Sequence, residues 1–246
     1  AMTKLRYTTP VWVLRRFVSR HEGLYRLASA LRGNSQLARG GEDLVMDGFP
    51  RSANSWAEAA FLVAQAGRGP LRIAHHCHAA AQLLAGARLG LPTLVLVRAP
   101  ADAVLSYREM LDVPVPFAQL FADYVALYQP LLARQDRLCF AGFDDIVNDF
   151  GSVIRRLNRT FSTDFAVPTH DAAFVGQVRA EMDRISILRT GQPTRYSGAR
   201  GAEFARTRDE RRRVLQAELK AALGSAPARA AAALYESLKP LIATKA

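Results

Sequence analysis

The sequence predicts a single α/β domain over residues 1–246, built on a parallel sheet that helices flank, with helical additions at both ends. Short apolar runs alternate with stretches of helical periodicity, which is the pattern of consecutive β-α-β units. The run Thr93–Val97 is apolar throughout, as expected for a strand that is buried on both faces. Half of the residues are hydrophobic and no repeat or linker divides the chain, so one sizeable core is expected.

The first predicted element is a helix over Leu5–Gly33, where apolar residues recur at helical spacing and arginines fill the other positions. A short apolar strand, Asp43–Gly48, then leads through the polar turn Pro50–Ser55 into a helix over Ser55–Ala66. The later elements continue this alternation: strands at Leu71–His76, Thr93–Val97 and Leu138–Gly142, and helices at Ala79–Leu89, Ala101–Met110, Phe117–Arg134, Gly151–Phe161, Asp209–Leu223 and Ala228–Ile242.

The chain carries 33 Lys and Arg residues against 22 Asp and Glu residues, a net charge of +11. This excess attracts nucleic acid, an acidic membrane surface or a phosphorylated small molecule without choosing among them, and an arginine-rich composition explains it equally well. Cys77 and Cys139 lack the spacing of a disulfide framework or a zinc module, which favours a reducing compartment. No apolar run approaches the roughly 20 residues of a membrane span and no signal peptide is recognised, so a cytoplasmic protein is expected.

The residues after the first predicted strand form a candidate anion site. Residues 47–56, Asp-Gly-Phe-Pro-Arg-Ser-Ala-Asn-Ser-Trp, run from the strand end through a turn into a helix. Parallel sheets bind ligands at the carboxyl ends of their strands, and a helix N-terminus offers unpaired N–H groups to an anion. Ser52, Asn54 and Ser55 add polar side chains, and Arg51 adds a planar guanidinium that matches phosphate or sulfonate oxygens. An ordinary helix start after a strand is the alternative.

A second candidate anion site follows the strand Thr93–Val97. Arg98 ends this strand, and Ser106 lies two turns along the helix that begins after Pro100. An arginine at a strand end and a serine on the following helix can converge on one anion. Taken alone, Arg98 has an alternative interpretation as an exposed residue at a strand end.

Both segments resemble motifs of the sulfotransferases that use 3′-phosphoadenosine 5′-phosphosulfate (PAPS). Pro50–Trp56 is similar to the family's loop Pro-[Lys/Arg]-Ser-Gly-Thr-Thr-Trp, with Ala53 in the glycine position and Arg51 as in carbohydrate-type and bacterial members. Val95–Tyr107 resembles the family's site for the 3′-phosphate. The resemblance covers Asp43–Phe161 and implies a P-loop-like sheet, PAPS as the sulfuryl donor, 3′,5′-bisphosphoadenosine (PAP) as the product, and no required metal.

The resemblance also implies a set of cofactor-binding residues in these two motifs and in a late basic segment: Arg51, Ser52, Ala53, Asn54, Ser55, Trp56, Arg98, Ser106, Arg195, Arg200 and Gly201. Trp56 would lie against the adenine, and the segment Thr190–Arg206 would close over the cofactor. The glycines of this segment predict a flexible loop, and a plain basic surface loop is the alternative. Asp144 and Asp145 are expected to cap the helix that follows them.

Three histidines follow the second predicted strand: His75, His76 and His78. Histidine can take a proton near neutral pH, and sulfuryl transfer to a hydroxyl needs such a base. The resemblance puts the base at His76. His78, expected on the same strand face, is the second choice for the base or a substrate contact. Arg51 would neutralise charge on the departing phosphosulfate bridge. Packed core histidines and a metal site are the alternatives for this cluster.

The sequence therefore predicts a PAPS-dependent sulfotransferase that acts on a hydroxyl or amine of a small molecule, glycan or lipid. A nucleotide kinase or NTPase is the first alternative, but the P-loop lysine and the Mg²⁺-binding carboxylate on a later strand are not seen. A non-enzymatic basic module for nucleic acid or anionic lipid is the second, and no nucleic-acid motif is found. The apolar stripe and five arginines of the first helix are also typical of a helix that contacts a membrane surface. The alternative is a helix that packs on the core and exposes its polar face to solvent.

Overall fold

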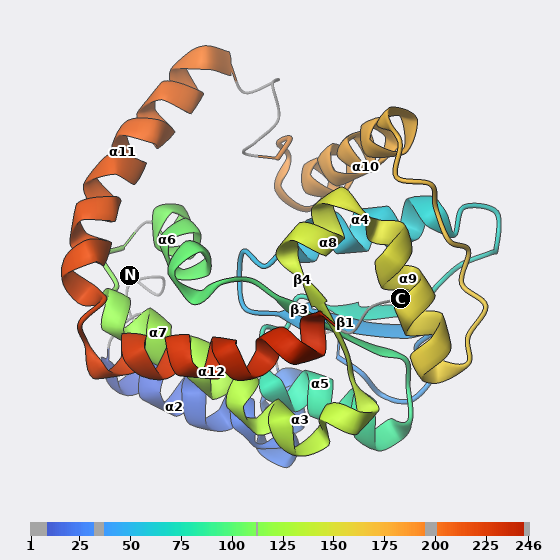
Figure 1. Cartoon of the computed structure of the whole chain (residues 1–246), viewed down its shortest axis with the longest axis horizontal. Helices are drawn as coiled ribbons and strands as arrows, with labels where there is room; N and C mark the ends of the chain where they lie inside the picture. The colour runs from blue at the N-terminus through green and yellow to red at the C-terminus, as the bar shows by residue number, and fades with distance from the viewer. Residues whose placement is uncertain (1–8, 32–36, 112, 195–200, 244–246) are drawn as a thin grey trace.

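The computed structural model describes residues 9–31, 37–111, 113–194 and 201–243. Within these residues, four strands form one parallel sheet with helices on both faces (Figure 1). The strands are β1 (Leu44–Gly48), β2 (Ile73–His75), β3 (Thr93–Val97) and β4 (Cys139–Gly142). Their order is β2-β1-β3-β4, and every neighbouring pair is parallel. The predicted α/β class, with helices that flank a parallel sheet, is confirmed.

The helices of the described residues include several that the sequence did not predict as such. They are α2 (Thr9–Arg20), α3 (Glu22–Leu31), α4 (Asn54–Ala64), α5 (Ala80–Leu89), α6 (Pro100–Met110), α7 (Phe117–Tyr128), the 3₁₀ segment η1 (Gln129–Arg137), α8 (Phe143–Asn148), α9 (Phe150–Phe161), α10 (Ala172–Thr190), α11 (Gly201–Ala222) and α12 (Ala226–Ile242). The single N-terminal helix is two helices, and α8 and α10 are additions. Phe174, Val178, Met182 and Ile185 of α10 pack on the core at helical spacing, but exposed apolar residues such as Ile187 and Leu188 weaken the periodic pattern. No described helix is both long enough and apolar enough to cross a bilayer.

Alternate strand residues pack into two separate hydrophobic clusters, one on each face of the sheet. One cluster joins the sheet to α4, α8, α9 and α10, and its strand residues are Leu44, Met46, Leu94, Leu96, Cys139 and Ala141. The other joins the sheet to α5, α6, α7, α11 and α12, and its strand residues are Val45, Ala74, Val95, Val97 and Phe140. Figure 1 shows these two layers of helices on opposite sides of the strands.

The chain leaves the two central strands in opposite directions. After β1 it passes through α4 to β2 at one edge, and after β3 it passes through α6 and α7 to β4 at the other edge. Such a divergence opens a crevice at the carboxyl ends of the two strands, which is where open parallel sheets bind ligands. Gly48 pairs with Leu96, so the loops that begin at Phe49 and at Arg98 start next to each other.

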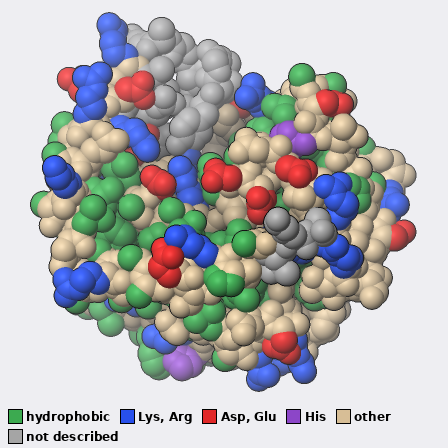
Figure 2. Space-filling view, in the orientation of Figure 1, with side chains coloured by type: hydrophobic (Ala, Val, Ile, Leu, Met, Phe, Trp, Pro, Cys, Tyr) green, Lys and Arg blue, Asp and Glu red, His purple; other side chains and the backbone are tan. Residues whose placement is uncertain are grey.

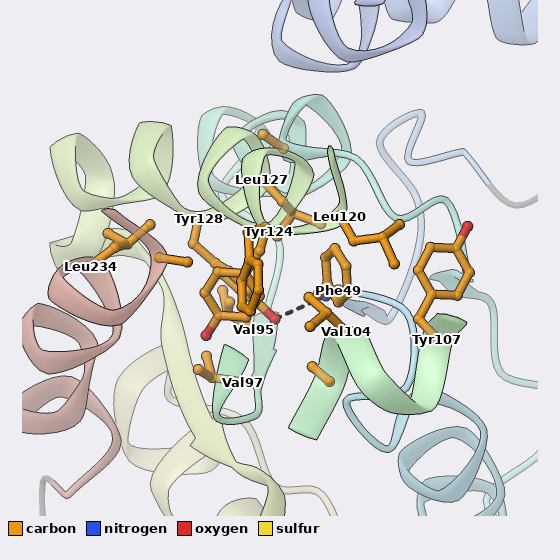
Figure 3. Packing of buried hydrophobic residues seen from close by; sticks show 14 of the residues in the cluster. Phe49, Val95, Val97, Val104, Tyr107, Leu120, Tyr124, Leu127, Tyr128 and Leu234 are labelled. Atoms are coloured by element: carbon orange, nitrogen blue, oxygen red, sulfur yellow. Dashed lines mark hydrogen bonds between the residues drawn. The ribbon is translucent and has the colours of Figure 1, made fainter. Parts of the chain in front are cut away.

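Two buried tyrosines of α7 hold both loops (Figure 3). The Tyr128 hydroxyl accepts the Phe49 N–H at 2.9 Å and donates to the Leu96 carbonyl at 2.6 Å. The Tyr124 hydroxyl donates to the Arg98 carbonyl at 2.8 Å. Burial raises the pKa of both hydroxyls, so both stay protonated and able to donate. The core therefore fixes the positions at which the two loops begin.

Candidate functional site

The loop after β1 adopts a backbone conformation that few residues other than glycine adopt. Arg51 and Ala53 have φ angles of 73° and 66°, in the left-handed region. The Phe49 carbonyl accepts the Ser52 N–H at 3.1 Å and the Asn54 side-chain amide at 3.1 Å, which closes the turn before α4. Glycine adopts such a backbone without strain, so the conformation of this turn favours glycine at position 53.

The two predicted anion sites meet at one corner in front of this loop, which we call the arginine corner: Arg51, Arg98 and Ser106. Arg51 Nε donates to Ser106 Oγ at 3.1 Å, and the Arg98 guanidinium donates to the Arg51 carbonyl at 3.1 Å. The Arg98 guanidinium also lies over the ring of Phe143, at 4.1 Å from the ring centre. Two guanidinium groups beside one hydroxyl can bind an anion that has several oxygens.

A polar hollow of the surface lies beside Arg98, at the carboxyl ends of β3 and β4. Three carboxylates share it with Arg98: Asp102, Asp144 and Asp145. Because these carboxylates repel a phosphate, an anion that binds Arg98 is expected on the side that faces Arg51.

The prediction that Asp144 and Asp145 cap the next helix is wrong. Helix α8 begins directly after β4, so both residues lie in its first turn, and Gly142 is the N-cap. There their negative charges interact favourably with the positive, N-terminal end of the helix dipole. The cap is on the following helix, where the Asp149 side chain accepts the Ser152 N–H at 3.1 Å.

The histidine cluster begins where β2 ends, at His75. His76 and His78 have φ angles of 55° and 50°, so the expectation that they share a strand face is wrong. The turns still bring their rings together, with centroids 5.7 Å apart. His76 Nε2 lies 3.2 Å from Ser55 Oγ at the start of α4, so the cluster touches the loop after β1.

His78 is tied to the end of β1. Its Nδ1 lies 2.8 Å from the Gly48 carbonyl and 3.3 Å from the Asp47 carboxylate. Asp47 is fully buried and accepts the backbone N–H groups of Cys77 and His78 at 2.9 and 2.8 Å. Burial disfavours a charge on His78, but the hydrogen bond and charge of Asp47 outweigh it and raise the pKa of His78 above its ordinary value. With Nδ1 as the donor, Nε2 is the nitrogen that can accept a proton.

His75 and His76 face a buried carboxylate of α4. Glu58 lies 3.5 Å from His75 Nε2 and 3.5 Å from His76 Nδ1, and Arg189 of α10 approaches it to 2.7 Å. Burial first, and then the charges of His78, His75 and Arg189, lower the pKa of His76 to about 2. Burial also lowers the pKa of His75. Both rings are therefore neutral near pH 7.

Three residues of this cluster are close enough together to be the ligands of the metal site that the sequence left as an alternative. One ligand atom from each of Glu58, His75 and His76 lies within 4.8 Å of the others. However, Arg189 already donates to both oxygens of Glu58, at 2.7 and 3.3 Å, and the Nδ1 atoms of the two histidines are 2.6 Å apart. A metal ion there has to displace this guanidinium, because like charges repel at such distances.

The remaining predicted site residues lie away from the arginine corner or outside the described residues. Trp56 donates its Nε1–H to the Ile146 carbonyl at 3.0 Å and packs, half-buried, against the cluster that includes α8. Arg195 and Arg200 lie outside the described residues. Gly201 is the first residue of α11, so the end of the predicted loop Thr190–Arg206 is helical. Its start is also helical, since α10 ends at Thr190.

Sequence reasoning missed the groups that surround the histidines: Asp47, Glu58 and Arg189. Asp47 had a signal, because a carboxylate inside an apolar strand and next to a glycine must find buried partners. Glu58 had a similar signal, since it is the one charged residue of α4. Arg189 had none, as its helix was not predicted.

Comparison of the sequence with known protein families finds no matching family model, and comparison with curated proteins finds no matching relative.

Proposed function

We propose that the protein transfers a sulfuryl group from PAPS to an acceptor hydroxyl or amine. The observation that carries the proposal is the arginine corner at the carboxyl ends of β1 and β3. Arg51 and Arg98 are 47 residues apart in the sequence, yet the guanidinium of one donates to the backbone of the other. Both stand at motif positions whose counterparts bind phosphate or sulfonate oxygens in the sulfotransferases that the chain resembles. A P-loop-like arrangement, with the anion at the start of α4, is part of this proposal.

The two ends of the donor occupy different parts of the site in this scheme. Arg51 and the N–H groups at the start of α4 bind the 5′-phosphosulfate, and Arg98 with Ser106 binds the 3′-phosphate. The acceptor oxygen attacks sulfur, and the bond between sulfur and the bridging oxygen breaks, so that PAP leaves with the bonding electrons. Arg51 neutralises the charge that develops on that oxygen.

We propose that the acceptor proton goes to His78 and not to His76, the first choice from the sequence. A base with a pKa of about 2 holds a proton poorly, and the buried His76 is such a base. The pKa of His78 is raised by Asp47, and its Nε2 is the ring nitrogen left to accept a proton. His78 also lines a small hollow of the surface beside Phe49 and Pro50, so its ring can be reached from that side.

Calorimetry with PAP tests the proposal. Arg98→Ala is expected to weaken PAP binding by about 2–4 kcal/mol, because it removes a charge-assisted contact, and Ser106→Ala by about 1 kcal/mol. The matched control is Arg179→Ala, which removes an equal charge from an exposed position on α10. Unchanged affinity in a folded Arg98→Ala variant contradicts the assignment of the corner.

Transfer of labelled sulfuryl from PAPS to a panel of hydroxyl compounds separates the enzyme from a binding module. PAP binding without any label transfer would leave a non-enzymatic module for bisphosphates. ATP hydrolysis that depends on Mg²⁺ would instead favour the nucleotide kinase or NTPase.

A further inference from the structure

Helices α2 and α3 turn most of their large apolar residues away from the core. Exposed residues of α2 include Val13, Leu14 and Phe17, at 52%, 62% and 53%, and these positions share one helical face. On α3 the corresponding face holds Leu24, Leu27 and Leu31, which are 46%, 60% and 81% exposed. The alternative of packing on the core holds for Trp12 of α2 and does not hold for this apolar stripe. Hydrophobic side chains reach the surface at the lower left rim of Figure 2, over the part of the molecule where α2 and α3 run in Figure 1.

This docking face, which we define as Val13, Leu14, Phe17, Leu24, Leu27 and Leu31, is unusual within the protein. Thirteen large hydrophobic residues are exposed among the described residues, and seven of them lie between Val11 and Leu31. Single exposed apolar residues are normal on a soluble protein, but a concentration of them on two consecutive helices marks an interaction surface.

The opposite sides of the same helices hold them on the protein by other contacts. Trp12 is 3% exposed, and its Nε1–H donates to Asp123 of α7, which also pairs with Arg16 at 2.6 Å. On α3, Ser29 is buried, and Glu22 pairs with Arg88 of α5 at 2.5 Å. The orientation of both helices is thus fixed with the docking face outward.

Charge identifies the kind of partner. Residues 9–31 contain four arginines and one carboxylate, Glu22. Arg20 is exposed and borders the apolar face of α2, where its long side chain can reach toward headgroups, whereas Arg15 lies on the side of α2 that lines the hollow near His78. Glu22 lies on the other side of α3 from Leu24, Leu27 and Leu31, and is already paired. The docking face therefore has a basic rim and no carboxylate within it.

We infer that this face binds the surface of a membrane that contains anionic lipids, with both helices lying in the plane of the interface. An apolar face with Arg20 on its rim, on a segment with a net positive charge, matches acyl chains below and anionic headgroups around it. A second copy of the chain fits less well, because it brings an equal set of arginines against the same rim. The inference is independent of the proposed sulfuryl transfer.

The position of α2 connects this surface to the candidate site. The side of α2 that carries Arg15, Arg16 and Ser19 lines the hollow that His78 also lines. A docked molecule would hold that hollow about one helix diameter, roughly 10 Å, from the lipid surface.

Flotation of the full chain with vesicles tests the inference. The protein is expected to float with vesicles of phosphatidylcholine mixed with phosphatidylglycerol, and to be released by high salt, which screens the arginines. Leu14→Glu with Phe17→Glu should lower partitioning about tenfold or more, since both carboxylates enter the apolar face. Because these side chains are exposed, the fold should survive, and circular dichroism checks it. Leu27→Glu on α3 provides a second, independent variant.

Leu188→Glu is the matched control, because Leu188 is 73% exposed on α10, away from the docking face. It should leave flotation unchanged, whereas Arg20→Glu should weaken it and reduce its sensitivity to salt. Equal flotation of the wild type and of Leu14→Glu with Phe17→Glu overturns the inference, as does an absence of wild-type flotation with these vesicles. If the wild type does not float but forms dimers in gel filtration, and Leu14→Glu dissociates these dimers, then a second copy of the chain covers this face.

Discussion

The free energy of unfolding should fall steeply on mild acidification because of His76. Burial and neighbouring charges lower its pKa to about 2 in the folded protein, whereas an unfolded histidine titrates near 6.5. Between these two values the unfolded chain binds one more proton than the native protein, so stability decreases as pH falls through this window. The slope is about 1.4 kcal/mol per pH unit, which amounts to about 2 kcal/mol between pH 6.5 and about pH 5. That loss is a large part of the stability of an ordinary domain.

Urea unfolding at several pH values measures this slope, and His76→Asn should reduce it to the part that His75 contributes, since burial lowers the pKa of His75 as well. Asparagine suits the left-handed backbone at this position, where φ is 55°, so the variant keeps the turn. The control is His21→Asn, at an exposed position between α2 and α3. His78 does not blur the result, because its raised pKa adds stability that is present below pH 6.5 and is lost as pH rises through its folded value. Equal slopes in the wild type and His76→Asn would refute the reasoning and return His76 to first place as the base.

Three further predictions concern the site and the loop that supports it. His78→Asn should lower kcat by at least about 100-fold and leave PAP affinity unchanged, and His76→Asn should lower kcat less. The acid limb of the wild-type pH–rate profile should lie above the ordinary histidine pKa, because Asp47 raises the pKa of His78. In urea unfolding, Ala53→Gly should be neutral or stabilise the protein by up to about 1 kcal/mol, since glycine adopts the left-handed backbone without strain. The control, Ala232→Gly on the exposed side of α12, should cost about 0.5–1 kcal/mol. Tyr128→Phe should cost about 1–3 kcal/mol in thermal or urea unfolding, because it leaves a buried N–H and a buried carbonyl without the hydroxyl; no change would mean that the hydroxyl does not hold the loops.

The sheet and the arginine corner were accessible from sequence because their signals are local. The bounds of β3, Thr93–Val97, agree with the prediction residue for residue, since a continuous apolar run has few other uses in an α/β chain. The turn chemistry of residues 50–55 and the arginine that ends β3 placed two candidate anion sites at strand ends. The two sites meet because β1 and β3 are neighbours in the sheet. The spacing of the motifs along the sequence does not reveal this strand order.

The parts that the sequence did not predict depend on partners that are distant along the chain. Periodicity showed that one face of the N-terminal helices is apolar, but an apolar face specifies burial without specifying against what. The tie between Trp12 and Asp123 decides the orientation of α2, and it joins residues 111 apart. In the same way, the pairing of Glu58 with Arg189 spans 131 residues and required a helix that periodicity did not reveal.

The opposite behaviour of two histidines on one turn follows from which carboxylate each one faces. Glu58 is closest to His75 and His76, but Arg189 neutralises it, so it cannot offset the burial of His76. Among the described residues, no arginine donates a hydrogen bond to Asp47; it accepts backbone N–H groups and lies beside Nδ1 of His78. Its charge is therefore available to a histidinium at that position. Two rings of the same type, with centroids 5.7 Å apart, therefore acquire pKa values shifted in opposite directions, and the proposed roles of the two histidines rest on this difference.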